Sequence, residues 1–375
     1  MIPIYQPYLT GREQEYVNMC LESSWISSKG EFISRFESQF ATHIGLQHAT
    51  SVCNGSVALH LAMQALGLKI GDEVIVPTLT YVASVNSIVQ TGGTPVFVDC
   101  LESTWQMDAE DIRRKITPQT KAIMAVHLYG LPCNLSQLVA LAKEYNLYLI
   151  EDCAEAFGSQ YNGQHVGTFG DVATFSFYGN KTITTGEGGM VVARDEAIVR
   201  RAYHLKTQGV SPVKEYWHDV MGYNYRMTNI CAAIGVAQLE SADEILKKKR
   251  QVAEWYKQKL QGLPIKTQAE CVNARHSFWM YSILVDQAEQ RDPLREALMR
   301  SGIETRPVFH PIHTLPPYQQ DESFPVAELL SRCGISLPSW PGLTEDLVEQ
   351  VCAGIWAYYD QLGSGAAISG KDVLL

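Results

Sequence analysis

The strongest constraint on the fold of this chain is an alternation of short β-type runs with helical segments. The runs rich in apolar and β-branched residues are DEVIVP (72–77), TPVFVD (94–99), KAIMAVHLYG (121–130) and LYLIED (147–152). Segments with helical periodicity, such as 81–92 and 135–146, lie between them. Strands and helices that alternate at this spacing build a mostly parallel sheet with helices on both faces. We therefore predict an α/β fold whose ligands gather outside the carboxyl ends of the strands.

A helix that could hold a phosphate is predicted just before this region, over NGSVALHLAMQAL (54–66). Asn54 is a favourable N-cap, apolar residues follow at helical spacing, and Gly67 closes the segment. At Gly55 and Ser56 the free backbone N–H groups, the helix dipole and a hydroxyl suit an anion. The alternative is an ordinary helix cap with no ligand.

The pattern changes after residue 238. The stretch 239–263 is predicted to be one long helix, and its basic cluster from Lys247 to Arg250 is interpreted as a solvated face. Short strands within 277–286 and 302–309 follow, and then a terminal helix near 344–362. We predict a large domain over 1–240, a smaller α+β domain over 241–362, and a flexible tail over 363–375, where the composition is linker-like.

Charge and composition exclude several functional classes. The 375-residue chain has a net charge of −10 and no basic stripe, which argues against a nucleic acid partner. Its nine cysteines include no CxxC pair, so neither a disulfide framework nor a zinc ribbon is expected. No apolar run approaches about 18 residues, and no signal peptide is evident. These features predict a cytoplasmic protein without a membrane segment.

Three further residues suggest chemistry at the strand ends. Tyr81 follows a strand and could lie flat on an aromatic ligand, and Asp152 ends the apolar run LYLI and needs a partner there. Lys181 stands between a short strand and a glycine-rich turn, in FSFYGNKTITTGEGGM (175–190). Each has a structural alternative: a core tyrosine, a helix-capping carboxylate and a solvated loop lysine.

Together these residues match the needs of pyridoxal 5′-phosphate (PLP). That cofactor requires a phosphate cup, an aromatic surface, an acid at its pyridine nitrogen and a lysine that binds its aldehyde. A nicotinamide dehydrogenase would instead need GxGxxG after the first strand, whereas GEGG (186–189) lies elsewhere. A non-catalytic protein of the same fold would be expected to lose Lys181 or Asp152, and both are present. The combination predicts a PLP enzyme.

The segment EDCAEAFGSQYNGQHVGTFGDVATFSFYGNKTITTGEGGM (151–190) resembles the signature of the DegT-type sugar-nucleotide aminotransferases, a branch of the fold-type I PLP enzymes. The resemblance extends over nearly the whole chain, through PYLTGREQEYV (7–17), SVCNGSVALHLAMQALG (51–67), GYNYRMTNICAAIGVAQLE (222–240) and ETRPVFHPIH (304–313). It implies a mostly parallel seven-stranded sheet between helices and a smaller α+β C-terminal domain.

The resemblance also implies roles for individual residues. Lys181 would bind the cofactor and shuttle a proton, and Asp152 would lie at the pyridine nitrogen. The remaining cofactor contacts it implies are phosphate binding by Gly55, Ser56 and Ser176, ring cover by Tyr81, and a place for Glu155 near the cofactor hydroxyl. Many relatives carry glutamine at the position of Glu155. Asn224 would reach the phosphate of the neighbouring subunit, which implies a homodimer with shared active sites.

The residue at position 181 separates two chemistries within this family. Its sugar dehydratases replace the lysine by histidine, so Lys181 favours transamination. Details such as WISSKG (25–30) and STWQM (103–107) resemble the branch that moves an amino group from L-glutamate to C4 of GDP-4-keto-6-deoxy-D-mannose, for surface polysaccharide such as O-antigen. The alternatives are a UDP- or dTDP-linked keto sugar aminated at C4 or C3, and a non-catalytic regulator.

The residues that would bind the nucleotide sugar are less clearly encoded. The candidates are polar or loop-like: Trp25, Ser27, Lys29, His127, Tyr129, Arg306 and His310. Arg306 could pair with a diphosphate or donor carboxylate, or form a surface ion pair. His310 and His313 flank a proline in HPIH without a carboxylate or cysteine companion, so no metal site is predicted.

Overall fold

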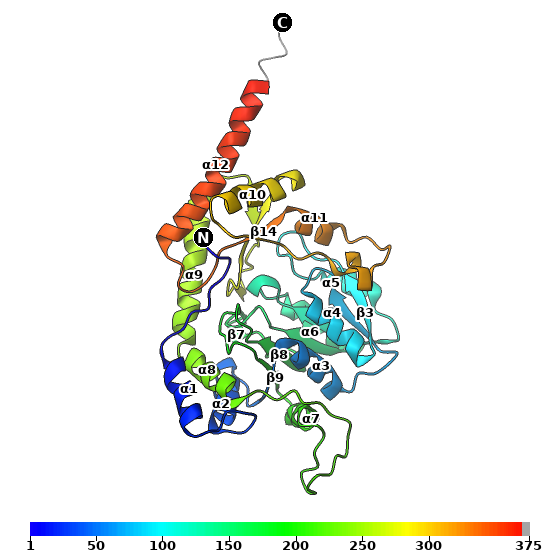
Figure 1. The fold of residues 1–375 in the computed structure, drawn as a ribbon. Helices are drawn as coiled ribbons and strands as arrows, with labels where there is room; N and C mark the ends of the chain where they lie inside the picture. Colours follow the sequence, from blue (N-terminus) through cyan, green and yellow to red (C-terminus); the bar gives the residue numbers. More distant parts are fainter. Residues whose placement is uncertain (370–375) are drawn as a thin grey trace.

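The computed structural model describes residues 1–369 and contains the expected α/β core (Figure 1). A seven-stranded sheet lies at its centre. In spatial order its strands are β1 (His48–Val52), β9 (Gly189–Ala193), β8 (Val172–Ser176), β5 (Tyr148–Asp152), β4 (Thr120–Val126), β2 (Glu73–Pro77) and β3 (Thr94–Val98). Only β9 runs antiparallel to its neighbours, so the predicted mostly parallel sheet is confirmed.

Helices cover both faces of this sheet. Alternate residues of β2 show why: Val74 and Val76 pack into one apolar cluster with α3, whereas Ile75 packs into another with α6. The helices between the strands are α3 (Gly55–Leu66), α4 (Val82–Thr91), α5 (Ala109–Lys115), α6 (Leu135–Tyr145) and α7 (Glu196–Lys206). The period-two pattern of buried residues therefore places each strand between two helical layers.

Local signals set two element ends. The Oδ1 atom of Asn54 accepts a 3.0 Å hydrogen bond from the Val57 N–H, and α3 ends before Gly67 at φ 82°, as the sequence predicts. By contrast, β4 ends at Val126, four residues before the predicted run does. The chain there turns into a short 3₁₀ segment, η1 (Leu128–Gly130), in which Tyr129 has a left-handed backbone at φ 59°.

Four helices flank the sheet on its β1 side: α1 (Arg12–Glu22), α2 (Glu31–Ile44), α8 (Asn229–Glu240) and α9 (Ala242–Lys259). The helix predicted over 239–263 is interrupted, because α8 ends at Glu240 and α9 begins after Ser241. The interpretation of Lys247–Arg250 as a solvated face is wrong at Lys249, which is fully buried. Its Nζ atom lies among oxygen atoms of Trp279 and Ser339, which are far from it in the sequence.

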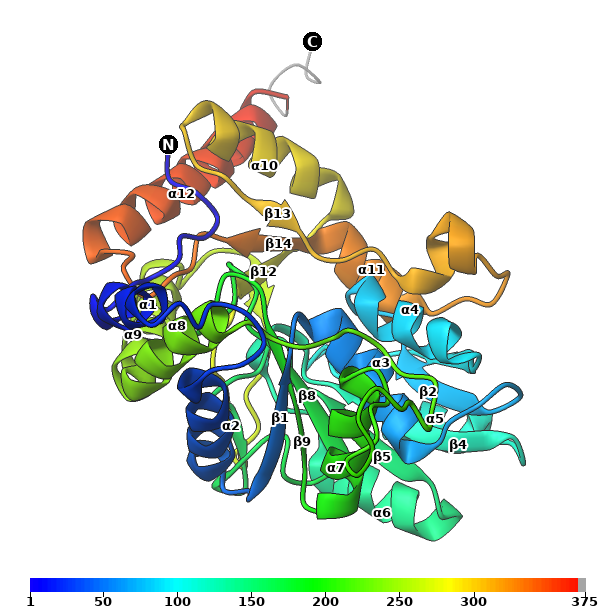
Figure 2. The same ribbon diagram turned by 60° about the horizontal axis from the view of Figure 1, so that its bottom comes forward.

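The C-terminal part contains a second, four-stranded sheet at one end of the molecule (Figures 1 and 2). Its strands in order are β10 (Ile265–Thr267), β12 (Tyr281–Val285), β14 (Gly334–Leu337) and β13 (Arg306–Pro307). The helices of this part are α10 (Arg291–Arg300), α11 (Pro325–Cys333) and α12 (Glu345–Ser369), and short 3₁₀ turns are η2 (Ala288–Gln290), η3 (Ile312–Thr314) and η4 (Pro316–Tyr318). A small third sheet joins β11 (Ala274–Arg275), β6 (Gln160–Tyr161) and β7 (Gln164–His165).

The first residues of the chain lie beside this C-terminal part (Figure 2). Ile2 forms a parallel bridge with Ile303, so the first residues contact the region predicted as the smaller domain. The boundaries at 240 and 362 stay predictions. Of the predicted tail over 363–375, α12 covers the residues to Ser369, and 370–375 lie outside the described part. Among the described helices, none combines the length and apolar character needed to cross a bilayer.

Candidate active site

The topology brings the predicted site residues to one edge of the large sheet. Asp152 ends β5, Ser176 ends β8, and Gly55 begins α3 directly after β1. Tyr81 stands at the start of α4, beyond the end of β2. Because these strands run in the same direction, their carboxyl ends meet and their terminal side chains share one region.

Asp152 is buried and held by two donors. Its Oδ2 atom accepts a hydrogen bond from Ser84 Oγ at 2.8 Å, and Oδ1 accepts one from the Ala154 N–H at 3.0 Å. Burial raises the pKa of Asp152, while these hydrogen bonds and the charge of Lys181 act in the opposite direction. The carboxylate is thus fixed in place and would gain from a further positive partner.

Lys181 lies half-buried in the loop between β8 and β9. A turn closed by the Lys181 N–H and the Tyr178 carbonyl places it there, and the Tyr5 hydroxyl donates to the Lys181 carbonyl at 2.6 Å. Burial lowers the pKa of Lys181, and the charges of Glu155 and Asp152 oppose that shift. A lysine with a lowered pKa is a better nucleophile and proton carrier near neutral pH than an exposed one.

Glu155 is a second buried carboxyl beside Lys181. Its Oε2 atom accepts the Tyr129 backbone N–H at 2.7 Å. Burial raises the pKa of Glu155 to about 7, although the charge of Lys181 opposes the shift. The group therefore titrates near neutral pH in the folded protein.

Gly55 and Ser176 are in direct contact. A Cβ atom at position 55 would lie 2.7 Å from the Cβ of Ser176, so only glycine lets that serine approach the first turn of α3. Ser56 is exposed at the same turn. The free N–H groups of this helix start and two hydroxyls together form a suitable cup for a phosphate.

A row of aromatic rings borders the site. Tyr81 is 57% exposed, and its ring lies 5.7 Å from that of Phe309. Phe309 stacks on Tyr129 at 5.3 Å, and Tyr129 stacks on Trp279 at 6.0 Å, measured between ring centroids. Residues from β2–α4, η1 and the C-terminal part therefore meet here.

The structure places His127 differently from the other predicted substrate residues. It is fully buried, and its Nδ1 atom accepts the Cys133 N–H while Nε2 lies 3.1 Å from Glu151 Oε2. With Nδ1 accepting, Nε2 carries the proton and donates to the carboxylate. Cys153 lies close to this pair, but hydrogen bonds already occupy the imidazole, so the ring has no free nitrogen for a sugar or a metal.

The remaining substrate candidates lie on different elements and differ in burial. Arg306 is exposed, 3.9 Å from Glu304, and His310 is exposed next to Phe309. Tyr129 is buried, and its hydroxyl accepts the Phe309 N–H. The exposed residues Trp25, Ser27 and Lys29 belong to the α1–α2 loop, whose Trp25 and Ser27 carbonyls accept hydrogen bonds from Asn229.

His313 is buried, and its Nδ1 atom lies 2.7 Å from Thr78 Oγ1, which anchors the HPIH segment to the end of β2. Asn224 is exposed, and its Oδ1 atom accepts a hydrogen bond from Arg226 Nε at 3.1 Å. The neighbouring Tyr225 carbonyl accepts the Cys53 N–H. The segment that carries Asn224 therefore runs alongside the strand that leads into α3.

Three residues in this region were not predicted from the sequence. Ser84 binds Asp152, Phe309 joins two predicted aromatic residues, and Trp279 lies under Lys181. The spacing of Ser84 from Tyr81, one helical turn, was an available signal. Phe309 and Trp279 lie in strand-like runs, and nothing local distinguishes them from core residues.

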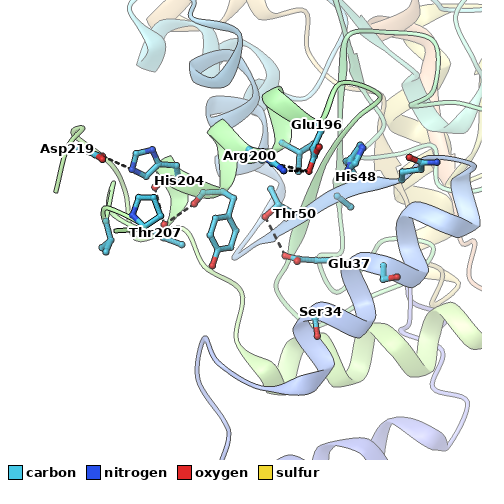
Figure 3. Close-up of a pocket in the computed structure, with 16 residues that line it drawn as sticks. Ser34, Glu37, His48, Thr50, Glu196, Arg200, His204, Thr207 and Asp219 are labelled. Carbon is cyan, nitrogen blue, oxygen red and sulfur yellow. Dashed lines mark hydrogen bonds and ion pairs between the residues drawn. The ribbon is translucent and has the colours of Figure 1, made fainter. Parts of the chain in front are cut away.

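A cavity of about 800 Å³ lies elsewhere, between α2, β1 and α7 (Figure 3). Its polar lining includes Glu37, Arg200, and an ion pair in which His204 Nε2 lies 2.7 Å from Asp219 Oδ1. None of the predicted site residues lines it. Size alone therefore does not identify the functional site of this chain.

Comparisons with known proteins agree with the geometry. A model of the DegT/DnrJ/EryC1/StrS aminotransferase family matches residues 7–356. The chain is 57% identical over 359 residues to the GDP-perosamine synthase of Escherichia coli O157:H7, covering 96% of this chain and 98% of that protein. It is 54% identical to the GDP-perosamine synthase of Vibrio cholerae, with 96% and 100% covered.

A comparison with solved structures supports the same fold and family. The aminotransferase TlmJ from Streptoalloteichus hindustanus superposes with a TM-score of 0.93 at 31% identity, over 97% of this chain and 100% of that one. The predicted resemblance and fold are thereby confirmed. The chain belongs to the DegT/DnrJ/EryC1/StrS aminotransferase family.

Proposed function

We propose that the protein is a PLP-dependent aminotransferase that moves the amino group of L-glutamate to C4 of GDP-4-keto-6-deoxy-D-mannose, giving GDP-perosamine for surface polysaccharide such as O-antigen. The observation that carries the choice of sugar nucleotide is the identity of 57% and 54% to two GDP-perosamine synthases over nearly their full lengths. The reaction class is supported by Lys181, since the lysine is retained where a dehydratase would carry histidine.

The residues at the sheet edge fit PLP. Glycine at position 55 lets Ser176 approach the start of α3, because a Cβ there would lie 2.7 Å from the Cβ of Ser176. Asp152 is a buried carboxylate that would gain from a pyridinium partner, and Lys181 supplies an amine. When bound, PLP supplies an electrophilic carbon for amines and an electron-withdrawing ring.

Each residue then has a distinct task. Gly55, Ser56 and Ser176 would hold the phosphate, while Asp152, fixed by Ser84, would keep the ring nitrogen protonated. Lys181 would bind the cofactor and, once released, would carry a proton as general base and acid. Because the pKa of Lys181 is lowered by burial, a larger share of its amine is free to accept that proton near neutral pH.

Two residues would complete the cofactor site. Tyr81, exposed beside Phe309, would cover the face of the ring. Glu155 would lie near the cofactor hydroxyl, where a carboxyl that titrates near pH 7 exchanges a proton more readily than an amide does. For the nucleotide sugar we retain the exposed candidates Trp25, Ser27, Lys29, Arg306 and His310, with Tyr129 holding Phe309, and leave out the enclosed His127.

The assembly and location follow from the same proposal. We infer a cytoplasmic homodimer in which Asn224 reaches the partner's cofactor phosphate. The exposed apolar residues of the 208–226 loop support such an assembly, because a second copy would cover them.

The test begins with the loaded protein and excess L-glutamate. The expected result is loss of absorbance from the aldehyde form of the cofactor and formation of 2-oxoglutarate. GDP-4-keto-6-deoxy-D-mannose should then restore the absorbance, with a GDP-linked amino sugar as product. Mass spectrometry and NMR of the product would establish amination at C4 and its stereochemistry.

Other outcomes would each remove one part of the proposal. Recovery with UDP- or dTDP-linked keto sugars alone would leave an aminotransferase and reject the GDP sugar. No change with glutamate would reject the amino donor or the reaction. A protein that does not bind PLP at all would reject the enzyme assignment.

A further inference from the structure

Trp279 lies directly under the amine of Lys181. The Lys181 Nζ atom lies 4.0 Å from the centroid of the indole ring. Trp279 comes from the segment before β12, far from Lys181 in the sequence. In the described part of the chain, no hydrogen bond or ion pair joins Nζ to a carboxylate, and the amine instead contacts the indole face.

The indole is held from several sides. Its Nε1–H donates to the Asn180 carbonyl at 2.7 Å, which connects it to the residue before the lysine. The indole also stacks on the ring of Tyr129, with an angle of 11° between the two ring planes. Trp279 is itself buried, so its face is a fixed surface.

A buried lysine fixes the backbone of Trp279. The Lys249 Nζ atom lies 3.1 Å from the Trp279 carbonyl, 2.9 Å from the Ser339 carbonyl and 2.6 Å from Ser339 Oγ, and burial lowers the pKa of Lys249 well below its usual value. Three oxygen atoms therefore hold this nitrogen in place. Lys249 lies in α9 and Ser339 follows β14, so the position of the indole depends on packing in the C-terminal part.

An aromatic face and a carboxylate hold an amine in different ways. An ion pair with hydrogen bonds fixes the ammonium in one place and favours its protonated form strongly. A ring face attracts the ammonium without accepting a directed hydrogen bond, and tryptophan does so best among the aromatic residues. An ammonium on such a surface keeps its N–H groups free to donate to a bound reactant.

We propose that Trp279 is a positioning residue for the reaction, whose indole face holds the protonated amine of Lys181 when that amine is not bonded to the cofactor. This rests on the proposed function, because it gives Trp279 its role through Lys181. Trp279 extends the site beyond the residues of the large sheet. It also makes the placement of Lys181 depend on the C-terminal part of the chain.

The test compares Trp279→Phe with Trp279→Leu in the full-length protein. Both changes remove the Nε1–H donor, and only Phe retains a ring face. In the cofactor-free protein, the rate at which dilute acetic anhydride acetylates Lys181 is measured against pH by peptide mass spectrometry, with exposed Lys69 as the internal reference. The inflection gives the pKa of the amine directly.

We expect the pKa of Lys181 to fall by about one unit in the Leu variant, because the ammonium loses an attraction that the neutral amine does not feel. The Phe variant should fall by less than half as much. In the loaded enzyme, the acid limb of the pH profile of kcat should also move to lower pH, further in the Leu variant than in the Phe variant. Should the Leu variant not fold, Trp279→Met provides the same comparison.

Equal inflections in the parent, Phe and Leu proteins would overturn the proposal, as would an upward shift in the Leu protein. Failure of the proposed function is recognised separately. Borohydride treatment of the loaded protein should fix the cofactor to the peptide that contains Lys181. If that label is absent while the acetylation curves still differ, the indole holds the amine but the cofactor role of Lys181 is rejected.

Discussion

At the scale of single residues, Lys181 is the position on which the reaction depends. Its amine has a lowered pKa and two carboxyls nearby, Asp152 and Glu155. We expect Lys181→Ala to retain part of the bound cofactor, since the phosphate cup and Asp152 are unchanged. Its turnover should fall by about a hundredfold to ten-thousandfold, the usual contribution of a positioned proton carrier. Absorbance spectra and steady-state rates check both expectations.

The matched control is Lys69→Ala, at an exposed lysine outside the site, which should behave as the parent does. A Lys181→Ala protein that turns over normally would reject the assignment of this lysine. Loss of the cofactor together with the fold, seen by circular dichroism, would show a structural role instead.

Glu155 makes stability depend on pH. Its pKa is raised from 4.5 to about 7, so the folded protein keeps a proton there that the unfolded chain releases in that window. Stability therefore falls as pH rises from about 4.5 to 7, and the buried charge costs up to about 3 kcal/mol above it. Glu155→Gln carries no charge, so its advantage in Tm over the parent should grow through this window in the cofactor-free protein.

Thermal unfolding at several pH values measures this difference. Glu187→Gln, at an exposed carboxylate, is the matched control for the removal of one negative charge. If the difference in Tm between the Glu155→Gln protein and the parent does not change with pH, the buried carboxyl does not titrate in this range.

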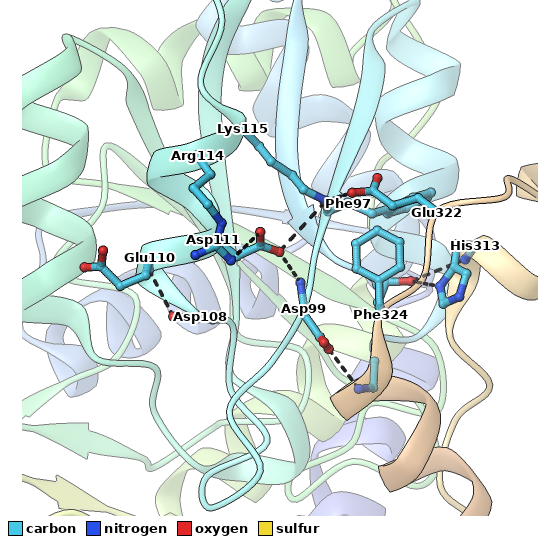
Figure 4. Close-up of polar contacts among 12 residues, drawn as sticks. Phe97, Asp99, Asp108, Glu110, Asp111, Arg114, Lys115, His313, Glu322 and Phe324 are labelled. Carbon is cyan, nitrogen blue, oxygen red and sulfur yellow. Dashed lines mark hydrogen bonds and ion pairs between the residues drawn. The ribbon is translucent and has the colours of Figure 1, made fainter.

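At the scale of secondary-structure elements, α11 depends on a residue that follows strand β3 of the large sheet (Figure 4). This helix has no capping side chain of its own. Asp99, just beyond β3, accepts the N–H groups of Val326 and Ala327 at 3.0 and 2.8 Å. Nearby, Lys115 pairs with Glu322 at 2.7 Å. These contacts fix the chain that follows His310, close to the aromatic row.

Asp99→Ala should therefore loosen α11. Loss of a capping carboxylate costs about 0.5–2 kcal/mol, and the freed N–H groups should exchange with solvent faster. Hydrogen exchange over 309–328 is expected to accelerate. Asp108→Ala is the control, because Asp108 caps α5 in the same way and its loss should affect only the start of that helix. Unchanged exchange over 309–328 in the Asp99 variant would contradict the capping role.

Elements were predictable from the sequence where their signals are local. The cap at Asn54 and the alternation of strands and helices need only neighbouring residues. The burial of Lys249 was not predictable, because its acceptors come from residues 279 and 339. The role of His127 was not predictable for the same reason: it directly follows a strand, as a ligand-binding residue would, but its partner Glu151 lies on the adjacent strand.

At the scale of the whole molecule, topology explains which site residues could be predicted. The group of Gly55, Asp152 and Ser176 converges because parallel strands end at one edge. The positions of Trp25, Arg306 and Trp279 depend instead on how separate helices and sheets pack, which no local pattern encodes. The arrangement of a second subunit depends on packing between two folded chains, so it is harder still to predict from the sequence.

The loop that precedes Asn224 is the structural reason to expect that second subunit. It exposes Val213 at 92%, Tyr216 at 96% and Met221 at 87% of their surface. Large apolar side chains this exposed are costly in water unless a partner covers them. If the partner is a second copy, Asn224 lies where it can serve the neighbouring site.

Mixing two defective variants tests this arrangement. Lys181→Ala removes the amine of a protomer's own site, and Asn224→Asp would place a negative charge against the partner's phosphate. In a mixed dimer with shared sites, one site carries both changes and the other carries neither. After unfolding and refolding together at equal amounts, half the dimers are mixed, so about a quarter of all sites should regain parental activity. If Asn224 served only its own protomer, every site would carry one defect and the mixture would show just the average activity of the two variants.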